Sequence, residues 1–195
     1  MISAKDIAQL REKTGLGMME CKKALTEADG DETRAMEILR KRGATKAASK
    51  AERKTCAGVI ESYVHDGKIG VLVEVLAETD FVVRNDDFKA FIHDIALHIA
   101  AAAPKYVSES DVPSEEIDKE KEALLGQDDL RGKPAEIAEK IVEGRLKKFK
   151  QEICLLDQPF IKDPDKTIGE LLIALVAKTG EKIVISRFVR YQLGQ

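Results

Sequence analysis

Residues 59–76 read VIESYVHDGKIGVLVEVL, and this stretch decides the kind of fold. β-Branched residues lie on both sides of the dipeptide Asp66-Gly67. Asp-Gly tolerates the positive φ values of a tight primed turn, so the pattern predicts a β-hairpin with the apolar run Ile69–Leu76 as its second strand.

Helical patterns follow the hairpin. Residues 87–103 predict a helix that ends at Pro104. Further helices are predicted over 114–125, 134–149 with proline in its first turn, and from Thr167 through Lys178, where Thr167 and Glu170 form a capping box and Gly180 stops the helix. Residues 182–193 predict a last strand. Two strands, then helices, then one strand indicate antiparallel pairing in an α+β core. The inward face of the 87–103 helix carries Phe88, Phe91, Ile92, Ile95 and Ile99.

Residues 1–42 predict three short helices. Ser3 and Asp6 form a cap for the first, and residues 14–17 (TGLG) break it. The second runs over 17–27 and closes at Asp29-Gly30; the third starts at Asp31. Three helices in about forty residues are about the smallest unit that buries a core without disulfides or metal. The residues expected inside are Met18, Cys21, Ala24, Leu25, Ala35, Ile38 and Leu39.

Between these two regions the chain is basic. Residues 40–54 carry seven basic side chains and one acidic one, with alanines between them. This composition predicts a solvated helical linker. Contact with nucleic acid is the alternative, although no aromatic residue is interleaved for base stacking.

The composition excludes several classes of protein. The chain has 195 residues, 34% of them charged, and a net charge of -3, without the basic excess of a dedicated nucleic-acid binder. No apolar run approaches the roughly 20 residues needed to span a bilayer, and residues 1–6 lack the layout of a signal peptide. Three cysteines without a CxxC pair fit free thiols in a reducing, cytosolic setting.

The usual signs of catalysis are also missing from the sequence. There is no GxxxxGK[ST] loop, so we expect no direct binding of GTP or GDP by that route. His65, His93 and His98 show no metal-ligand spacing. Cys21 lies among apolar residues of a helix and is expected to be a small core residue rather than a nucleophile. We therefore expect no enzyme, no cofactor and no metal, although a spatial triad leaves no mark in spacing.

Residues 78–82 (ETDFV) stand out at the end of the apolar strand. An acid beside a large aromatic residue, at the point where a strand gives way to a loop, forms a tip that can insert into a partner. The alternative is that Phe81 folds back into its own core.

Two stretches, LREKTGLGMMECKKAL at 10–25 and TDFV at 79–82, resemble the two signature segments of elongation factor Ts, the nucleotide-exchange factor of the GTPase elongation factor Tu. The second segment differs from the usual family signature at two places: it reads VLAE before Thr79, and it has Val83 where the family usually has a small residue. Neither departure touches Asp80 or Phe81. The resemblance continues to the C-terminus through Gly132-Lys133-Pro134, Ile137–Lys140, Val142–Arg145, Lys147–Phe149 and Gln158–Phe160.

The resemblance implies three regions: a ubiquitin-associated-like three-helix bundle (1–42), the basic linker (43–55), and an α+β core (56–195) that binds elongation factor Tu and dimerises. Long members carry the core twice and this chain carries it once, so we expect a homodimer, with the sheet edge as one candidate contact and the geometry left open. It also implies a bacterial, cytoplasmic protein. The implied partner is elongation factor Tu, both GDP-bound and nucleotide-free.

The family also implies the contact residues. Thr79, Asp80, Phe81 and Val82 would form a loop that dislocates Mg²⁺ and shifts the phosphate-binding loop, so that GDP leaves and GTP reloads. In the N-terminal module the contacts would be Arg11, Met18 and Met19; because the two methionines are adjacent, one of them is expected to be exposed beside the arginine. Weaker matches are His65, Thr179 and Gly180.

Three other functions remain open at this stage: a ubiquitin-binding or general adaptor based on the helical module, an RNA-binding factor using residues 40–54, and an enzyme. The long C-terminal matches argue against the adaptor.

Overall fold

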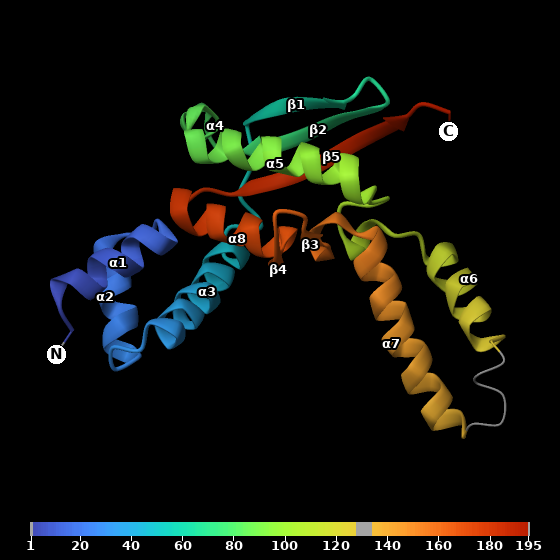
Figure 1. The fold of residues 1–195 in the computed structure, drawn as a ribbon, viewed down its shortest axis with the longest axis horizontal. Helices are drawn as coiled ribbons and strands as arrows, with labels where there is room; N and C mark the ends of the chain where they lie inside the picture. Colours follow the sequence, from blue (N-terminus) through green and yellow to red (C-terminus); the bar gives the residue numbers. More distant parts are fainter. Residues whose placement is uncertain (1, 128–133, 195) are drawn as a thin grey trace. The chain divides into compact units, whose positions relative to one another are not determined.

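The structure is a computed structural model that describes residues 2–127 and 134–194 (Figure 1). It is an α+β fold, as predicted, with a three-stranded sheet in the order β1-β2-β5 and a two-stranded sheet β3-β4. The chain forms two compact units. Unit 1 consists of Met1–Ile60, Glu74–Ile92 and Glu170–Ile185; unit 2 consists of Glu61–Val73, His93–Gly169 and Ser186–Gln195.

The elements are α1 (Ala4–Thr14), α2 (Met18–Glu27), α3 (Glu32–Ala48), β1 (Ala57–His65), β2 (Ile69–Ala77), α4 (Asp80–Arg84), α5 (Asp86–Ala102), the 3-10 helix η1 (Glu109–Asp111), α6 (Ser114–Leu125), α7 (Ala135–Ile153), the 3-10 helix η3 (Leu155–Asp157), β3 (Pro159–Phe160), β4 (Asp163–Thr167), α8 (Ile168–Thr179) and β5 (Ile183–Gln192).

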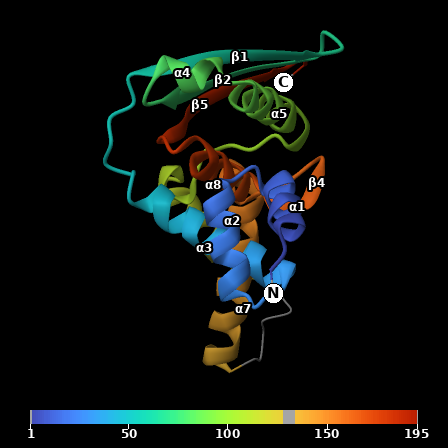
Figure 2. The same ribbon diagram turned by 90° about the vertical axis from the view of Figure 1, so that its left-hand side faces the viewer.

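The three N-terminal helices pack together, as Figure 2 shows. The predicted capping box is present, since Ser3 and Asp6 bond each other's backbone N–H groups at the start of α1. Gly15 ends α1 with a φ of 67°, a value that favours glycine. α3 continues to Ala48, six residues beyond the end of the predicted module. The shared core consists of Leu10, Cys21, Ala24, Leu25, Ala28, Ala35 and Leu39.

One residue of this module was placed wrongly from the sequence. Met18 was expected inside, but it is 48% exposed. It begins α2, one turn before Cys21, and Leu16 of the preceding turn packs against the core instead. The buried face of α2 therefore begins at Cys21, one turn later than predicted.

The hairpin and its turn are confirmed. Asp66 and Gly67 both have positive φ, 48° and 67°, and β2 alternates strictly, with its odd-numbered residues from Val71 to Ala77 buried. β5 pairs along the other side of β2, where the N–H of Leu193 donates to the carbonyl of Lys68 at 2.8 Å. α5 lies along one face of the sheet, and Arg190 of β5 bonds the carbonyl of Ala100 in α5 (Figure 1).

Gly58 in β1 allows the two hairpin strands to approach closely. A Cβ at this position would lie 2.8 Å from the carbonyl oxygen of Val75 and 2.8 Å from a methyl carbon of Leu76. Because a backbone atom cannot move aside cheaply, we expect Gly58→Ala to lower the free energy of unfolding by about 1–3 kcal/mol in urea titrations. Gly70→Ala in β2 is the control, since no described atom beyond the glycine and its two chain neighbours lies within 4 Å of its Cβ position. Equal effects of the two substitutions would contradict this explanation.

In unit 2, α6 and α7 form an antiparallel pair (Figure 1), with a small core around Leu124 and Val142. α6 has the predicted bounds. α7 runs four residues past the predicted end, and Pro134 occupies its N-cap rather than its first turn. Gly132 and Lys133 of the family resemblance lie outside the described residues. The β3-β4 pair was not predicted.

His98 is a fully buried polar residue on α5. Its Nδ1 accepts from the N–H of Ile161 (3.4 Å), so Nε2 carries the ring proton and donates to Oε1 of Gln158 (2.9 Å). The Gln158 amide in turn donates to the carbonyl of Glu152 at 2.6 Å. Burial lowers the pKa of His98 below its ordinary value, against the opposite effect of the Gln158 bond. The neutral ring therefore joins α5 to the β3-β4 segment.

We expect this histidine to make the protein less stable as the pH decreases. Because the pKa of His98 is lower in the folded than in the unfolded chain, only the unfolded chain gains the proton once the pH falls below about 6.5. Between pH 7.5 and 5.5 the unfolding free energy should fall, by at most about 1.4 kcal/mol for one proton. Urea unfolding of the wild type and His98→Gln at both pH values measures it, with the exposed His93→Gln as control. The same pH dependence in His98→Gln as in the wild type would refute the assignment.

Candidate functional site

The segment expected to be a loop is a short helix. α4 begins at Asp80, directly after its N-cap Thr79, and ends at Arg84. Phe81 is 82% exposed, whereas Val82 is only 8% exposed. Asp80 is mostly exposed and pairs with Arg84 one turn later (3.1 Å). The prediction that Phe81 is exposed is thus confirmed. The prediction of a loop was wrong, because Phe81 lies on a short helix.

Two glutamates hold the start of this helix. Both donors of Thr79 bond the carboxylate of Glu181: the backbone N–H at 3.0 Å and the hydroxyl at 2.8 Å. In return, the carboxylate of Glu78 accepts from the N–H of Lys182 at 2.6 Å. This backbone bond, supported by Arg53, lowers the pKa of Glu78. The two residues that follow β2 and the two that precede β5 are therefore bonded to each other reciprocally.

The predicted contacts Thr179 and Gly180 lie beside this clamp. They belong to the α8–β5 turn (Lys178–Lys182), which also contains Glu181. Gly180 ends α8 with a φ of 75°, and the hydroxyl of Thr179 accepts from the N–H of Glu181 at 3.4 Å. Although they are a hundred residues apart in sequence, the Thr79 and Thr179-Gly180 segments meet within unit 1.

The same turn contacts other parts of unit 1. Lys178 pairs with Asp87 at the start of α5 (2.7 Å). Its aliphatic carbons lie beside Gly15, where an added Cβ would come 3.0 Å from Cε and 3.2 Å from Cδ. The turn that separates α1 from α2 thus packs against the end of α8.

The basic stretch 40–54 is not simply solvated. Lys50 bonds the carbonyl of Gly180, and Arg53 pairs with Glu78 at 3.3 Å. Five of the seven basic side chains have a partner within the protein, and this weakens the interpretation of the stretch as an RNA-binding surface. The other three pairs are Arg40 with Glu170, Arg42 with Glu27, and Lys46 with Glu20.

The three residues predicted as N-terminal contacts lie on an exposed surface. Met19 is 62% exposed, so both Met18 and Met19 are accessible rather than one of them. Arg11 is exposed in the last turn of α1. Met19 also lines an open groove of about 370 Å³ together with Lys22 and Lys23 of α2 and Arg42 of α3. Flexible thioethers beside cations are suited to an adaptable protein contact.

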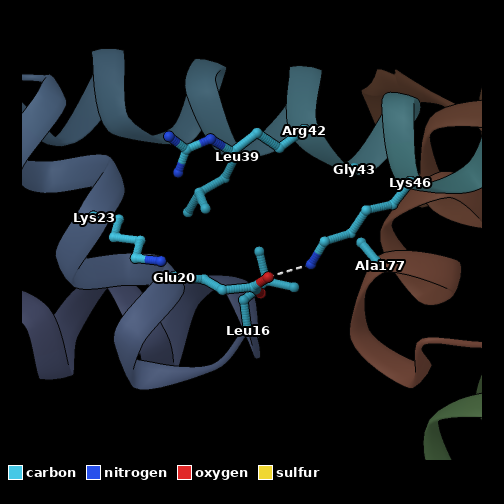
Figure 3. A pocket seen from close by; sticks show the side chains of 8 residues that line it. All are labelled: Leu16, Glu20, Lys23, Leu39, Arg42, Gly43, Lys46 and Ala177. Atoms are coloured by element: carbon cyan, nitrogen blue, oxygen red, sulfur yellow. Dashed lines mark hydrogen bonds and ion pairs between the residues drawn. The ribbon is translucent and has the colours of Figure 1, made fainter.

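A pocket of about 260 Å³ lies between α2, α3 and α8 (Figure 3). Lys46 reaches across it to the carboxylate of Glu20, as the dashed line shows. Gly43 allows α3 to approach α8, because a Cβ there would lie 3.4 Å from that of Ala177. Residues of the helical module and of α8 therefore line this pocket together.

His65 lies in unit 2, at the end of β1. Its ring stacks on Tyr63 with a centroid distance of 6.1 Å, and its Nδ1 is 3.1 Å from the Tyr63 hydroxyl. His93 of α5 contacts Tyr63 edge-on and approaches Glu61 at 3.4 Å. The three rings form a cluster in which the two histidines are exposed and Tyr63 is half-buried.

Two features of the described residues bear on metal binding and thiol chemistry. None of their His, Cys, Asp and Glu side chains form a group that could hold a metal ion. Cys21 is buried in the core, as expected, and burial raises the pKa of Cys154 to about 11, far from a reactive thiolate. Within the same part of the chain, no helix is long and apolar enough to cross a membrane.

Sequence reasoning missed the roles of Glu78 and Glu181. Glu78 directly precedes the predicted contact Thr79, and Glu181 directly precedes the predicted last strand. Their hydrogen-bond partners, however, are about a hundred residues away in the sequence. No spacing rule connects positions so far apart; only the pairing of β2 with β5 brings them together.

Comparison with known proteins extends these observations. The family model described as "Elongation factor TS" matches residues 45–195. The elongation factor Ts of Acetivibrio thermocellus is 57% identical over 196 aligned residues, which cover all of this chain and 91% of that protein. The proteins of the same name from Moorella thermoacetica and Caldanaerobacter subterraneus subsp. tengcongensis are each 53% identical over the whole chain, which covers 97% and 98% of their lengths.

Proposed function

The chain belongs to the elongation factor Ts family, and from this premise we propose how it works as an exchange factor. Members of this family exchange the nucleotide of elongation factor Tu, so the protein acts in translation elongation and catalyses no chemical step. It binds elongation factor Tu in the GDP-bound and nucleotide-free states, in the cytoplasm, and needs no cofactor of its own.

The contact that drives release is the tip formed by Thr79, Asp80, Phe81 and Val82. The observation that carries this proposal is the opposite exposure of neighbours: Val82 anchors α4 in the core while Phe81 projects into solvent. A large aromatic side chain on an anchored helix can insert between elements of a partner at little entropic cost. Asp80 accompanies it as a charged, exposed acceptor.

Insertion of Phe81 displaces the elements that position Mg²⁺ and the phosphate-binding loop of the GTPase. Mg²⁺ neutralises phosphate charge, so its loss leaves that charge uncompensated and GDP dissociates faster. By linkage, GDP and the exchange factor must weaken each other's binding by the same factor, and an excess of GTP then completes the cycle.

The helical module supplies a second contact through Arg11, Met18 and Met19, whose exposure supports it. Thr179 and Gly180 belong to the same surface as the tip, because Glu181 joins their turn to Thr79. His65 is a separate contact in unit 2. In domain terms, residues 1–42 form the module, 43–55 the linker, and 56–195 the core.

A second copy of the chain completes the core. In unit 2, Val64, Leu72, Val189 and Tyr191 are exposed on the sheet strands. Each alternates with residues that are buried or contact α5, so these four side chains point away from α5. We assign this apolar face, rather than the sheet edge, as the homodimer contact. Light scattering should give twice the chain mass; a mass near 21.6 kDa would contradict it.

The function itself is tested by the release of fluorescent GDP from purified elongation factor Tu, followed with and without the wild-type chain. Acceleration that saturates with the concentration of the chain is expected. A folded wild type that leaves the release rate unchanged would overturn the proposed function.

A further inference from the structure

We infer that Glu181 is the positioning residue of the Asp80–Phe81 tip: its carboxylate fixes Thr79, and Thr79 fixes the direction in which α4 presents Phe81. This inference rests on the proposed function of the tip. It assigns a role in exchange to a residue that is not itself in the contact.

α4 cannot hold its own geometry. It has five residues, and isolated helices of this length are unstable in water. Its N-cap Thr79 makes no side-chain cap bond, because the hydroxyl points to Glu181 instead. The orientation of the helix must therefore come from outside it.

Three anchors supply that orientation. Val82 is buried in the core, and Asn85 bonds backward to the carbonyl of Val82 (3.0 Å) and forward to the N–H of Asp87 (2.8 Å). At the other end, the Glu181 carboxylate accepts two hydrogen bonds from Thr79, one from the backbone N–H and one from the hydroxyl. Two donors on one carboxylate fix direction as well as distance.

Glu181 is itself held in place. The N–H of its neighbour Lys182 is bonded to Glu78, and the Lys182 ammonium donates to the carbonyls of Ala51 and Arg53 at 2.5 and 2.9 Å. The carboxylate is thus part of a fixed turn rather than a free surface chain. A group placed in this way can preorganise the tip before the partner arrives.

The test separates positioning from binding. Glu181→Gln keeps the shape of the side chain but replaces one acceptor by a donor that faces the donors of Thr79. In the GDP-release assay at increasing concentrations of the factor, we expect the maximal rate to fall about tenfold, the loss of one charge-assisted hydrogen bond. The half-saturating concentration should change much less, because the helical module is untouched.

Two further readouts identify the bond itself. Thr79→Val removes only the hydroxyl donor, and its effect should not add to that of Glu181→Gln in the double variant. Thr79→Ser, which keeps the donor, should recover most of the loss. Hydrogen exchange of the amides of residues 79–84 should quicken in Glu181→Gln.

Glu116→Gln is the matched control. Its carboxylate also holds two donors, the Tyr106 hydroxyl and the Lys105 ammonium, but it lies in unit 2. It should leave the maximal rate unchanged. If Glu181→Gln does not fold, Thr79→Val carries the test. A wild-type maximal rate in both Glu181→Gln and Thr79→Val, with Phe81→Ala impaired, would overturn the inference and leave the function standing; an inactive wild type would overturn the function itself.

Discussion

Phe81→Ala is expected to slow factor-stimulated GDP release by about 100-fold, the effect of removing a central interface residue worth 2–4 kcal/mol. The unfolding free energy should stay within about 0.5 kcal/mol of the wild type, since an 82% exposed side chain leaves no cavity when removed. Stimulated release and urea unfolding are measured on the same preparation.

Leu125→Ala on α6 is the control for Phe81→Ala, because it also removes an exposed apolar side chain. It should change neither quantity. The double variant Asp80→Ala/Phe81→Ala should remain folded too, since the Asp80–Arg84 pair is solvent-exposed and such pairs add little stability. A loss of several kcal/mol in Phe81→Ala would mean that this side chain belongs to the core.

Phe88→Ala makes the same chemical change seven residues later, with the opposite expected result. Phe88 is fully buried on α5, so its removal leaves a cavity and should lower the unfolding free energy by about 3–5 kcal/mol. Urea unfolding midpoints measure it, and Phe88→Leu should lose less because it fills part of the space. A near-neutral Phe88→Ala would show that this part of the core collapses around the vacancy.

These two phenylalanines also show what sequence can predict. Phe88 repeats with Phe91, Ile92, Ile95 and Ile99 at the helical period, so its burial follows from local pattern. The Asp66-Gly67 turn and the Ser3–Asp6 cap were equally local. The exposure of Phe81 followed from a resemblance combined with its place after a strand, because a single residue has no period.

The features that were missed depend on contacts between distant residues. α4 is too short to show a helical period, and its start is held by Glu181 from a hundred residues away. β4 has the sequence DPDKT, whose composition favours a loop, and it becomes a strand only by pairing with β3. Likewise, the pairing of the basic residues 40–54 required Glu27 of α2, Glu78 just after β2 and Glu170 of α8.

The unequal burial of the three cysteines has a practical consequence. Cys21 and Cys154 are closed off from solvent, whereas Cys56 is exposed and its N–H bonds the carbonyl of Ala77, three residues before Asp80. A maleimide dye added to the natural chain should therefore attach at Cys56, next to the tip. The protein carries its own labelling site for observing, in real time, the arrival of the tip on its partner.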